Sequence, residues 1–148
     1  MSELDFRFLT TNQIIAIHDY ALQNDGGRPG IRDRKALESL VLSPQKRAAY
    51  ETVDAFDLAA AYAHSANRNP AFVDGNKRTA LTAALVFLGL NGYQGHNFRH
   101  DDLEKAVFYL ANSQITREMF AEYLQDGFDG VPGTWVDDPE GQPDRGTV

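Results

Sequence analysis

The sequence predicts an all-α fold: a compact, single-domain helical bundle followed by an irregular C-terminal tail. Apolar residues recur at helical spacing in several segments, most plainly at i, i+3, i+4 and i+7 from residue 81 to residue 88. The 148 residues fit one domain, and a hydrophobic content of 43% is enough for a sizeable core. We therefore expect a helical domain over residues 1–126 and a separate tail over residues 127–148.

The first two helices are predicted from their end signals. Thr10-Thr11-Asn12 can cap a helix that ends near Gly26-Gly27, because glycine is favoured just past a helix end. Asp33 can cap a second, short helix. We expect this helix to end at Ser43-Pro44, because the residue before a proline disfavours the helical conformation.

Residues 43–53 have no clear period and predict a loop, or a short extended flap. Asp54 can cap a third, alanine-rich helix that runs to Arg68. The fourth helix is plainly periodic from Arg78, and Asn91-Gly92 closes it.

Two further helices are expected, over about residues 101–111 and about residues 116–124. The composition then changes, because residues 127–148 contain five glycines and three prolines. Such a segment is expected to lack regular structure, with Trp135 as the one residue that would anchor it.

Composition excludes several classes of function. The chain has no cysteine, so a disulfide scaffold, a cysteine zinc site and a cysteine nucleophile are ruled out. Its formal net charge of -7 argues against direct nucleic-acid binding over the whole surface. No signal peptide and no membrane-spanning run are recognised, so a cytoplasmic protein without membrane contact is expected.

The segment Asp74-Gly75-Asn76-Lys77-Arg78 predicts a site for phosphate at a helix start. The start of a helix presents unpaired N–H groups and the positive end of the helix dipole, and Gly75 lets the backbone approach a ligand closely. Lys77 and Arg78 repel that dipole unless an anion binds beside them. Asp74 is the natural ligand for Mg²⁺ next to phosphate.

The same residues also fit a purely structural interpretation. Asp-Gly-Asn is ordinary turn chemistry, and Asp74 can act as no more than a helix cap. Lys77 and Arg78 can be solvated surface charges. The residues alone leave both interpretations open.

The stretch "FVDGNKRTALTAALVFLGLNGY" closely resembles the signature helix of the Fic/Doc superfamily, specifically its death-on-curing branch. The resemblance extends upstream through "GGRPGIRD" and downstream through "VFYLANSQITREMFAEYL", and it covers roughly residues 7–125. The tail lies outside it.

This resemblance implies a compact helical fold that holds a nucleoside triphosphate, ATP above all, with Mg²⁺. By position, Asp74 matches the metal ligand, Gly75 and Asn76 match the anion-holding turn, and Arg78 matches the phosphate-binding arginine. Lys77 stands where nucleotidyl-transferring relatives carry a glycine, which favours transfer of phosphate over transfer of AMP.

Death-on-curing members resemble the toxin of a toxin–antitoxin pair and modify a hydroxyl in the translation machinery. The resemblance therefore implies a small antitoxin protein as one partner and a translation protein as the target. The chain has no self-inhibitory helix of the [S/T]xxxE[G/N] type, so an inhibitor of its activity is expected to be a separate protein.

One part of the family motif is missing. The motif carries a general-base histidine two residues before its phenylalanine, but Pro70 stands two residues before Phe72. Tyr62 and Asn69 keep the register, so no gap moves a histidine into place. Proline has no group that can accept the proton of the acceptor hydroxyl.

Among the other histidines, His64 on the preceding helix is the weak candidate for a substitute base. His18 is expected to be structural, and His96 and His100 are expected to be loop residues.

Three functions remain. The first is an active phosphotransferase with a displaced base or a substrate-assisted route, and the second is a catalytically dead relative that binds nucleotide or a protein partner. The third, a pure interaction module, is disfavoured because residues 74–78 are retained.

Overall fold

The computed structural model describes residues 5–93 and 100–128, with the backbone alone at residues 100 and 128. These ranges contain α1 (Thr11–Asp25), α2 (Arg34–Tyr50), α3 (Ala55–Arg68), α4 (Asn76–Leu90), α5 (His100–Ala111) and α6 (Arg117–Phe128). Nothing else in the described ranges pairs as a strand except one isolated bridge between Ile31 and Phe72. The predicted all-α fold is confirmed.

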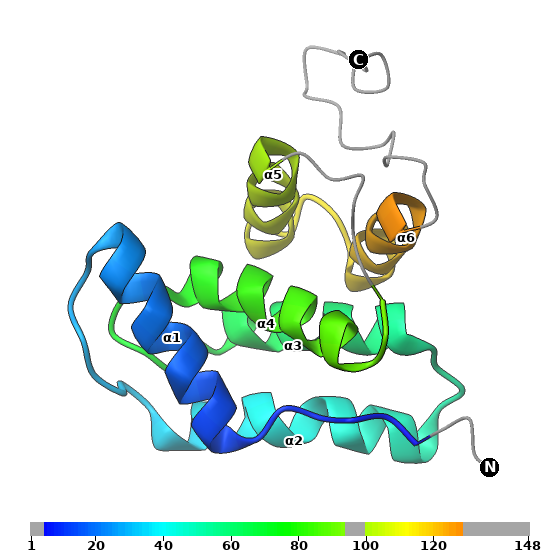
Figure 1. The fold of residues 1–148 in the computed structure, drawn as a ribbon, viewed down its shortest axis with the longest axis horizontal. Helices are drawn as coiled ribbons and strands as arrows, with labels where there is room; N and C mark the ends of the chain where they lie inside the picture. The colour runs from blue at the N-terminus through cyan, green and yellow to red at the C-terminus, as the bar shows by residue number, and fades with distance from the viewer. Residues whose placement is uncertain (1–4, 94–99, 129–148) are drawn as a thin grey trace.

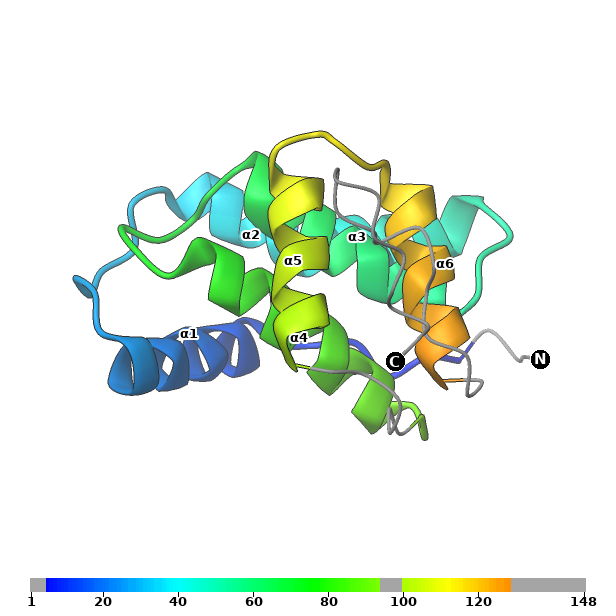
Figure 2. The same ribbon diagram turned by 90° about the horizontal axis from the view of Figure 1, so that it is seen from above.

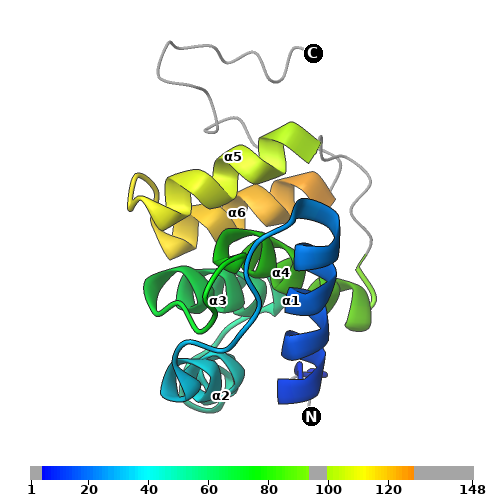
Figure 3. The same cartoon turned by 90° about the vertical axis from the view of Figure 1, so that its left-hand side faces the viewer.

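The helices form three layers (Figures 1 and 3). The pair α3 and α4 lies in the middle, α1 and α2 cover one side, and α5 and α6 cover the other. Seen from above, α5 and α6 lie across the central pair (Figure 2). The start of α4 lies beside the end of α1 and the first half of α5, where Arg78 pairs with Asp25 and Glu104.

The central pair is buried because its facing residues are small and apolar. Ala59, Ala63, Ala80 and Ala84 are all fully buried, and small side chains let two helix backbones approach closely. Larger rings fill the ends of the interface, where the centroids of Tyr62 and Phe87 lie 5.2 Å apart.

Tyr62 also fixes the segment before α1. Its hydroxyl oxygen accepts the N–H of Leu9 at 2.9 Å, and burial raises the pKa of this phenol to about 12. The hydroxyl therefore stays protonated at any physiological pH, and it holds the N-terminal segment on the core.

Most predicted helix ends agree with the structure within two residues. Thr10 and Asp54 cap α1 and α3 through capping boxes, and Gly26 follows α1 with φ of 79°. The helix α4 begins at Asn76, two residues before the predicted start, and α6 extends to Phe128. Residues 129–148, with Trp135, lie outside the described ranges.

The predicted end of the second helix is wrong. The helix α2 passes through Pro44 and continues to Tyr50. A proline inside a helix removes one hydrogen bond and costs roughly 3 kcal/mol. Pro44 is fully buried, so packing of this helix face offsets that cost; the Gln45 side chain also donates to the carbonyl of Val41 at 3.2 Å.

The flap expected over residues 43–53 is consequently also wrong. Residues 43–50 are helical, and only residues 51–54 connect α2 to α3. An extended segment does lie beside the motif loop, but it is residues 28–33, where Ile31 bridges to Phe72. No helix in the described ranges is both long and apolar enough to cross a bilayer.

Candidate anion-binding site

The loop before α4 is held by the segment 28–33. The N–H groups of Arg32 and Asp33 both donate to the carbonyl of Ala71, at 2.7 and 3.1 Å. In return, the N–H of Val73 donates to the carbonyl of Gly30 at 3.0 Å. Two chain segments forty residues apart in the sequence are thus joined as a short, rigid frame for the motif loop.

Two side chains close the loop from within. The Asn76 amide oxygen accepts the N–H of Phe72 at 3.1 Å, and its amide nitrogen donates to the Phe72 carbonyl at 2.9 Å. His18 from α1 lies beneath the loop, with Nε2 2.8 Å from the carbonyl oxygen of Asp74. The side chain of Asn76 therefore shapes the loop, and its backbone N–H remains part of the helix start.

Gly75 sets the direction in which α4 begins. It has φ of 81° and ψ of 16°, a left-handed conformation that glycine adopts without strain. It is the N-cap of α4 but has no side chain, so no side-chain acceptor caps this helix. The first N–H groups of α4 consequently keep their capacity to bind an anion.

Lys77 and Arg78 follow directly in the first turn, without an acidic residue there. Lys77 is exposed and makes no ion pair with the described residues. Arg78 is half-buried, and its Nε lies 2.9 Å from Oδ2 of Asp25 while its Nη2 contacts Glu104. Two of the three guanidinium nitrogens are therefore engaged, and Nη1 remains for a ligand.

A cavity of about 330 Å³ opens next to these cations. Its polar lining consists of two cations and two carboxylates, and its apolar lining includes the half-exposed Phe108; the residues are Asp25, Lys77, Arg78, Glu104, Leu81, Val107 and Phe108. Ligand sites commonly combine a few polar groups with an apolar wall. This cavity can hold a molecule with a charged end and an apolar or aromatic end.

Asp74, the expected metal ligand, lies on the exposed side of the loop. Its Oδ2 accepts the N–H of Arg28 at 2.7 Å, and the side chain is 45% exposed. Within the described ranges no three His, Cys, Asp or Glu side chains gather as a metal cluster. One carboxylate beside phosphate oxygens still fits Mg²⁺, which typically uses one or two carboxylates and keeps several waters.

The structure places no titratable side chain at position 70. Pro70 lies near the beginning of the α3–α4 connection, and its carbonyl accepts a hydrogen bond from Nη2 of Arg32 at 2.9 Å. The side chain bound to this position is therefore a guanidinium, which cannot take up a proton.

His64 is not brought to the loop cavity. It lines a different cavity, of about 340 Å³, between α3, the end of α5 and the start of α6. Burial lowers the pKa of His64, and the nearby Arg117 and Arg68 lower it further. His18 lies at the loop, whereas His96 and the side chain of His100 lie outside the described residues.

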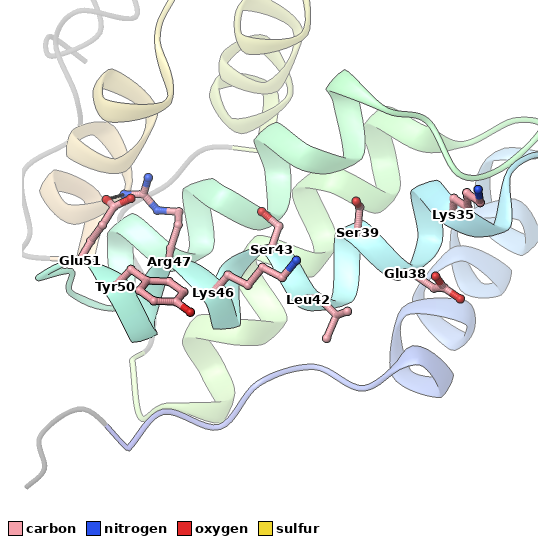
Figure 4. A pocket seen from close by; sticks show the side chains of 9 residues that line it. All are labelled: Lys35, Glu38, Ser39, Leu42, Ser43, Lys46, Arg47, Tyr50 and Glu51. Carbon is pink, nitrogen blue, oxygen red and sulfur yellow. Dashed lines mark ion pairs between the residues drawn. The ribbon is translucent and has the colours of Figure 1, made fainter.

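A larger cavity of about 660 Å³ lies along the outer face of α2 (Figure 4). Nearly all its lining residues belong to this one helix, and Leu42 and Tyr50 are its exposed apolar members. The other lining side chains include Lys35, Lys46 and the ion pair between Arg47 and Glu51. It shares no residue with the motif loop.

Sequence reasoning missed five residues at the site. They are His18, Asp25, Arg28, Arg32 and Glu104. Asp25 and Arg28 flank the glycine turn that was recognised, so their neighbourhood was readable. From the sequence, His18 could be placed only on the apolar face of α1, together with Ile14 and Ile17. Glu104 has no local signal, because only the packing of α5 brings it to Arg78.

The frame, the glycine start and the basic first turn together form one loop–helix unit, most of which lies within the segment that the sequence comparisons match. The model of the Fic/DOC family matches residues 8–88, more than half of the chain. The chain belongs to the Fic/DOC family.

Two named relatives are Doc proteins. The chain is 40% identical over 120 residues to "Protein kinase doc" of Escherichia phage P1, an alignment that covers 80% of this chain and 94% of the phage protein. It is 48% identical over 73 residues to "Toxin Doc" of Mycolicibacterium smegmatis, covering 47% of this chain and 55% of that protein. The similarity is therefore to the Doc branch of the family.

Proposed function

We propose that this chain is a Doc-like toxin that binds a nucleoside triphosphate, ATP above all, at the start of α4. Its reaction would be transfer of phosphate to a hydroxyl group of a protein in the translation machinery. The relative from phage P1 is named a protein kinase, and the mycobacterial relative is named a toxin.

One observation carries this proposal: α4 begins with two cations and no side-chain cap. Arg78 already pairs with Asp25 and Glu104. Lys77, in contrast, makes no ion pair with the described residues and is unfavourable beside the positive end of a helix dipole unless an anion binds there. The N–H groups of the first turn and the free Nη1 of Arg78 are donors that suit phosphate oxygens. The adjacent cavity is wide enough for more than the phosphates.

In the proposed reaction the hydroxyl oxygen forms a bond to the γ-phosphorus as the bond to the leaving diphosphate breaks. The amide groups of the α4 start, with Lys77 and Arg78, stabilise the negative charge on the phosphoryl oxygens. Asp74 would hold Mg²⁺, which supplies further charge neutralisation on the phosphates. The hydroxyl proton must leave to solvent or to a phosphate oxygen, because Pro70 cannot take it up.

A second function is favoured by that same proline. A positioned base typically contributes about 10² to 10⁴ in rate, so a chain without one can retain nucleotide binding and lose transfer. Such a relative would bind nucleotide, or a protein partner, without chemistry. In either case a small antitoxin protein is the partner we propose, in the cytoplasm, and we propose no direct contact with nucleic acid or membrane.

The two functions separate in one experiment. The purified chain is mixed with Mg²⁺ and ATP labelled on the γ-phosphate, with and without a cell-free translation extract, while calorimetry follows ATP binding. Binding together with label on a translation protein supports the toxin kinase, and binding without label supports the second function. No binding of ATP by the chain contradicts both.

A further inference from the structure

The contact that fixes the motif loop from below comes from a histidine that the proposed function does not use. His18 lies in α1 and is only 2% exposed. Its ring stacks on Phe72 with a centroid distance of 3.8 Å and an interplanar angle of 7°. Its Nε2 lies 2.8 Å from the carbonyl oxygen of Asp74.

The direction of this hydrogen bond follows from its partner. A carbonyl oxygen can only accept, so Nε2 of His18 must carry the proton and donate it to Asp74. Both groups lie on the buried side of the loop, where an unpaired polar group is costly. The imidazole and the loop carbonyl therefore depend on each other.

The hydrogen bond also determines where the next amide points. The peptide group between Asp74 and Gly75 is trans, so its C=O and N–H point in opposite directions. Because the carbonyl points down to His18, the N–H of Gly75 points away from the buried side. That N–H is the first of the donors at the start of α4.

The ring additionally forms the floor under Gly75. A Cβ added at Gly75 would lie 3.5 Å from the ring atoms Cδ2 and Nε2 of His18. The imidazole thus supports the loop in two ways: by stacking under Phe72 and contacting Gly75, and by binding the Asp74 carbonyl.

We propose that His18 is a positioning residue of the anion site: its Nε2–H holds the Asp74 carbonyl so that the Gly75 amide faces the bound phosphate. This inference rests on the proposed function, because it names the group that presents the phosphate-binding amides. His18 contacts no ligand itself, and its effect passes through one peptide group.

Two substitutions separate the hydrogen bond from the packing. His18→Phe keeps a ring against Phe72 but removes the donor, whereas His18→Gln places a side-chain amide donor near the position of Nε2 without the ring. Ile14→Val, in the same helix and fully buried, is the control for a general loss of stability in α1. Each protein is titrated with ATP and Mg²⁺ by calorimetry, and its melting temperature is recorded.

We expect His18→Phe to weaken ATP binding by about tenfold or more, the scale of one lost buried hydrogen bond in the frame. His18→Gln and Ile14→Val should bind ATP with an affinity within about threefold of that of the original chain. This should hold even where their melting temperatures fall as far as that of His18→Phe. Equal ATP affinity in His18→Phe and the original chain overturns the proposal. So does a loss of affinity that follows melting temperature across all three variants.

A second measurement does not depend on ATP binding. Residual dipolar couplings of the Gly75 N–H report the orientation of its peptide plane, and long-range ¹H–¹⁵N spectra report which ring nitrogen of His18 is protonated. We expect a proton on Nε2, and a Gly75 coupling that changes in His18→Phe but not in His18→Gln. If the original chain binds no ATP, the proposed function fails while these couplings still test His18. An unprotonated Nε2, or an unchanged coupling in His18→Phe, overturns the inference.

Discussion

The helix α2 follows the segment 28–33, and α4 follows the motif loop that this segment holds. Both helices carry two basic residues in or next to the first turn. In α2 these are Arg34 and Lys35, and Asp33 precedes them. The Asp33 carboxylate accepts the N–H groups of Lys35 and Ala36 at 3.0 and 3.1 Å. The helix α2 thus has its own capping carboxylate, which already binds two of its first N–H groups.

The start of α4 has no such capping carboxylate, although Arg78 pairs with Asp25 and Glu104 from other helices. Gly75 stands where α2 has Asp33, and neither of the next two residues, Asn76 and Lys77, is acidic. The Asn76 side chain binds back to Phe72 rather than capping the helix. The comparison indicates that basic residues at a helix start are not by themselves a site; a site requires that the chain leave the cap position empty.

The largest expected effect concerns the general base that is missing at position 70. Pro70→His should raise phosphate transfer to a protein hydroxyl by about 10² or more, the usual contribution of a positioned base. The bond from Arg32 to residue 70 is made to the backbone carbonyl, so it survives the substitution. Transfer is measured with labelled ATP, and Ala71→Pro can be added to recover the family backbone.

Pro70→Ala is the control, because it removes the ring without supplying a base. The double variant with histidine should also be more harmful to cells on expression. The prediction fails if the original chain already transfers at full rate and His64→Ala abolishes that rate, since the base would then have moved. Nucleotide binding without transfer in every variant would show a loss larger than one side chain.

Arg78→Ala should weaken ATP binding by about tenfold or more, because a hydrogen bond between charged groups contributes about 1.5–3 kcal/mol. It also leaves Asp25 and Glu104 without this arginine, which adds negative charge beside the cavity. Lys35→Ala removes one positive charge at the capped start of α2 and is the matched control. Equal losses of affinity in both variants would mean that net charge alone, and not the open helix start, attracts the nucleotide.

Gly75→Ala tests the empty cap position through the backbone. A side chain at φ of 81° costs about 1–2 kcal/mol, and the added Cβ would lie 3.3 Å from Cδ2 of Leu22. Gly26→Ala is the control for backbone strain alone, because its added Cβ would meet nothing within 4 Å and its φ of 79° with ψ of -177° is a conformation essentially restricted to glycine.

We expect both glycine variants to lower the free energy of unfolding in urea. Only Gly75→Ala should also weaken ATP binding. Equal ATP affinity in Gly75→Ala and Gly26→Ala would show that the conformation at residue 75 does not shape the site.

Asp33→Ala removes the anion that α2 carries and should lower the free energy of unfolding by about 1 kcal/mol, as for other lost helix caps. The backbone hydrogen bond from residue 33 to Ala71 remains, so the frame of the motif loop is kept. Urea unfolding measures the loss, which added sulfate should partly recover by binding at the newly opened start. Stability unchanged from the original chain would show that the two hydrogen bonds of Asp33 contribute nothing.

Local signals predicted the parts of this fold that local chemistry determines. The capping residues Thr10 and Asp54 and the glycine after α1 fixed three helix ends, because each acts within one turn. The prediction that the second helix ends at Pro44 was wrong for the opposite reason. Burial of a whole helix face stabilises the helix by more than one proline destabilises it. The misplaced flap was a consequence of the same error.

The candidate site likewise has a part that local sequence determines and a part that depends on packing between helices. Residues 74–78 are contiguous, so the glycine start and the basic turn could be predicted from the sequence. The ion pairs of Arg78 join three different helices, and the bond from His18 to Asp74 spans 56 positions. Such contacts depend on how the layers pack, and a single sequence contains no local pattern for them.

A third helix start extends the comparison and carries the smallest expected effect. In α6, Thr116 accepts the N–H of Met119 at 3.0 Å, and Arg117 is paired with Glu118 at 3.2 Å, so this start is satisfied like that of α2. His64 lies against it. Burial lowers the pKa of His64 below its ordinary value of 6.5, and Arg117 contributes to the shift.

The direction of the pH effect follows from the proton balance. Above pH 6.5 His64 is neutral in both states and changes nothing. As the pH falls below 6.5, the unfolded chain takes up the proton first, so the folded state loses stability until its own lower pKa is passed. His64→Gln should remove this loss. We therefore expect a smaller fall in the free energy of unfolding between pH 7.5 and pH 5.5 in His64→Gln than in the original chain. Parallel falls in the two proteins would mean that neither burial nor the nearby cations lower the pKa of His64 in the folded state.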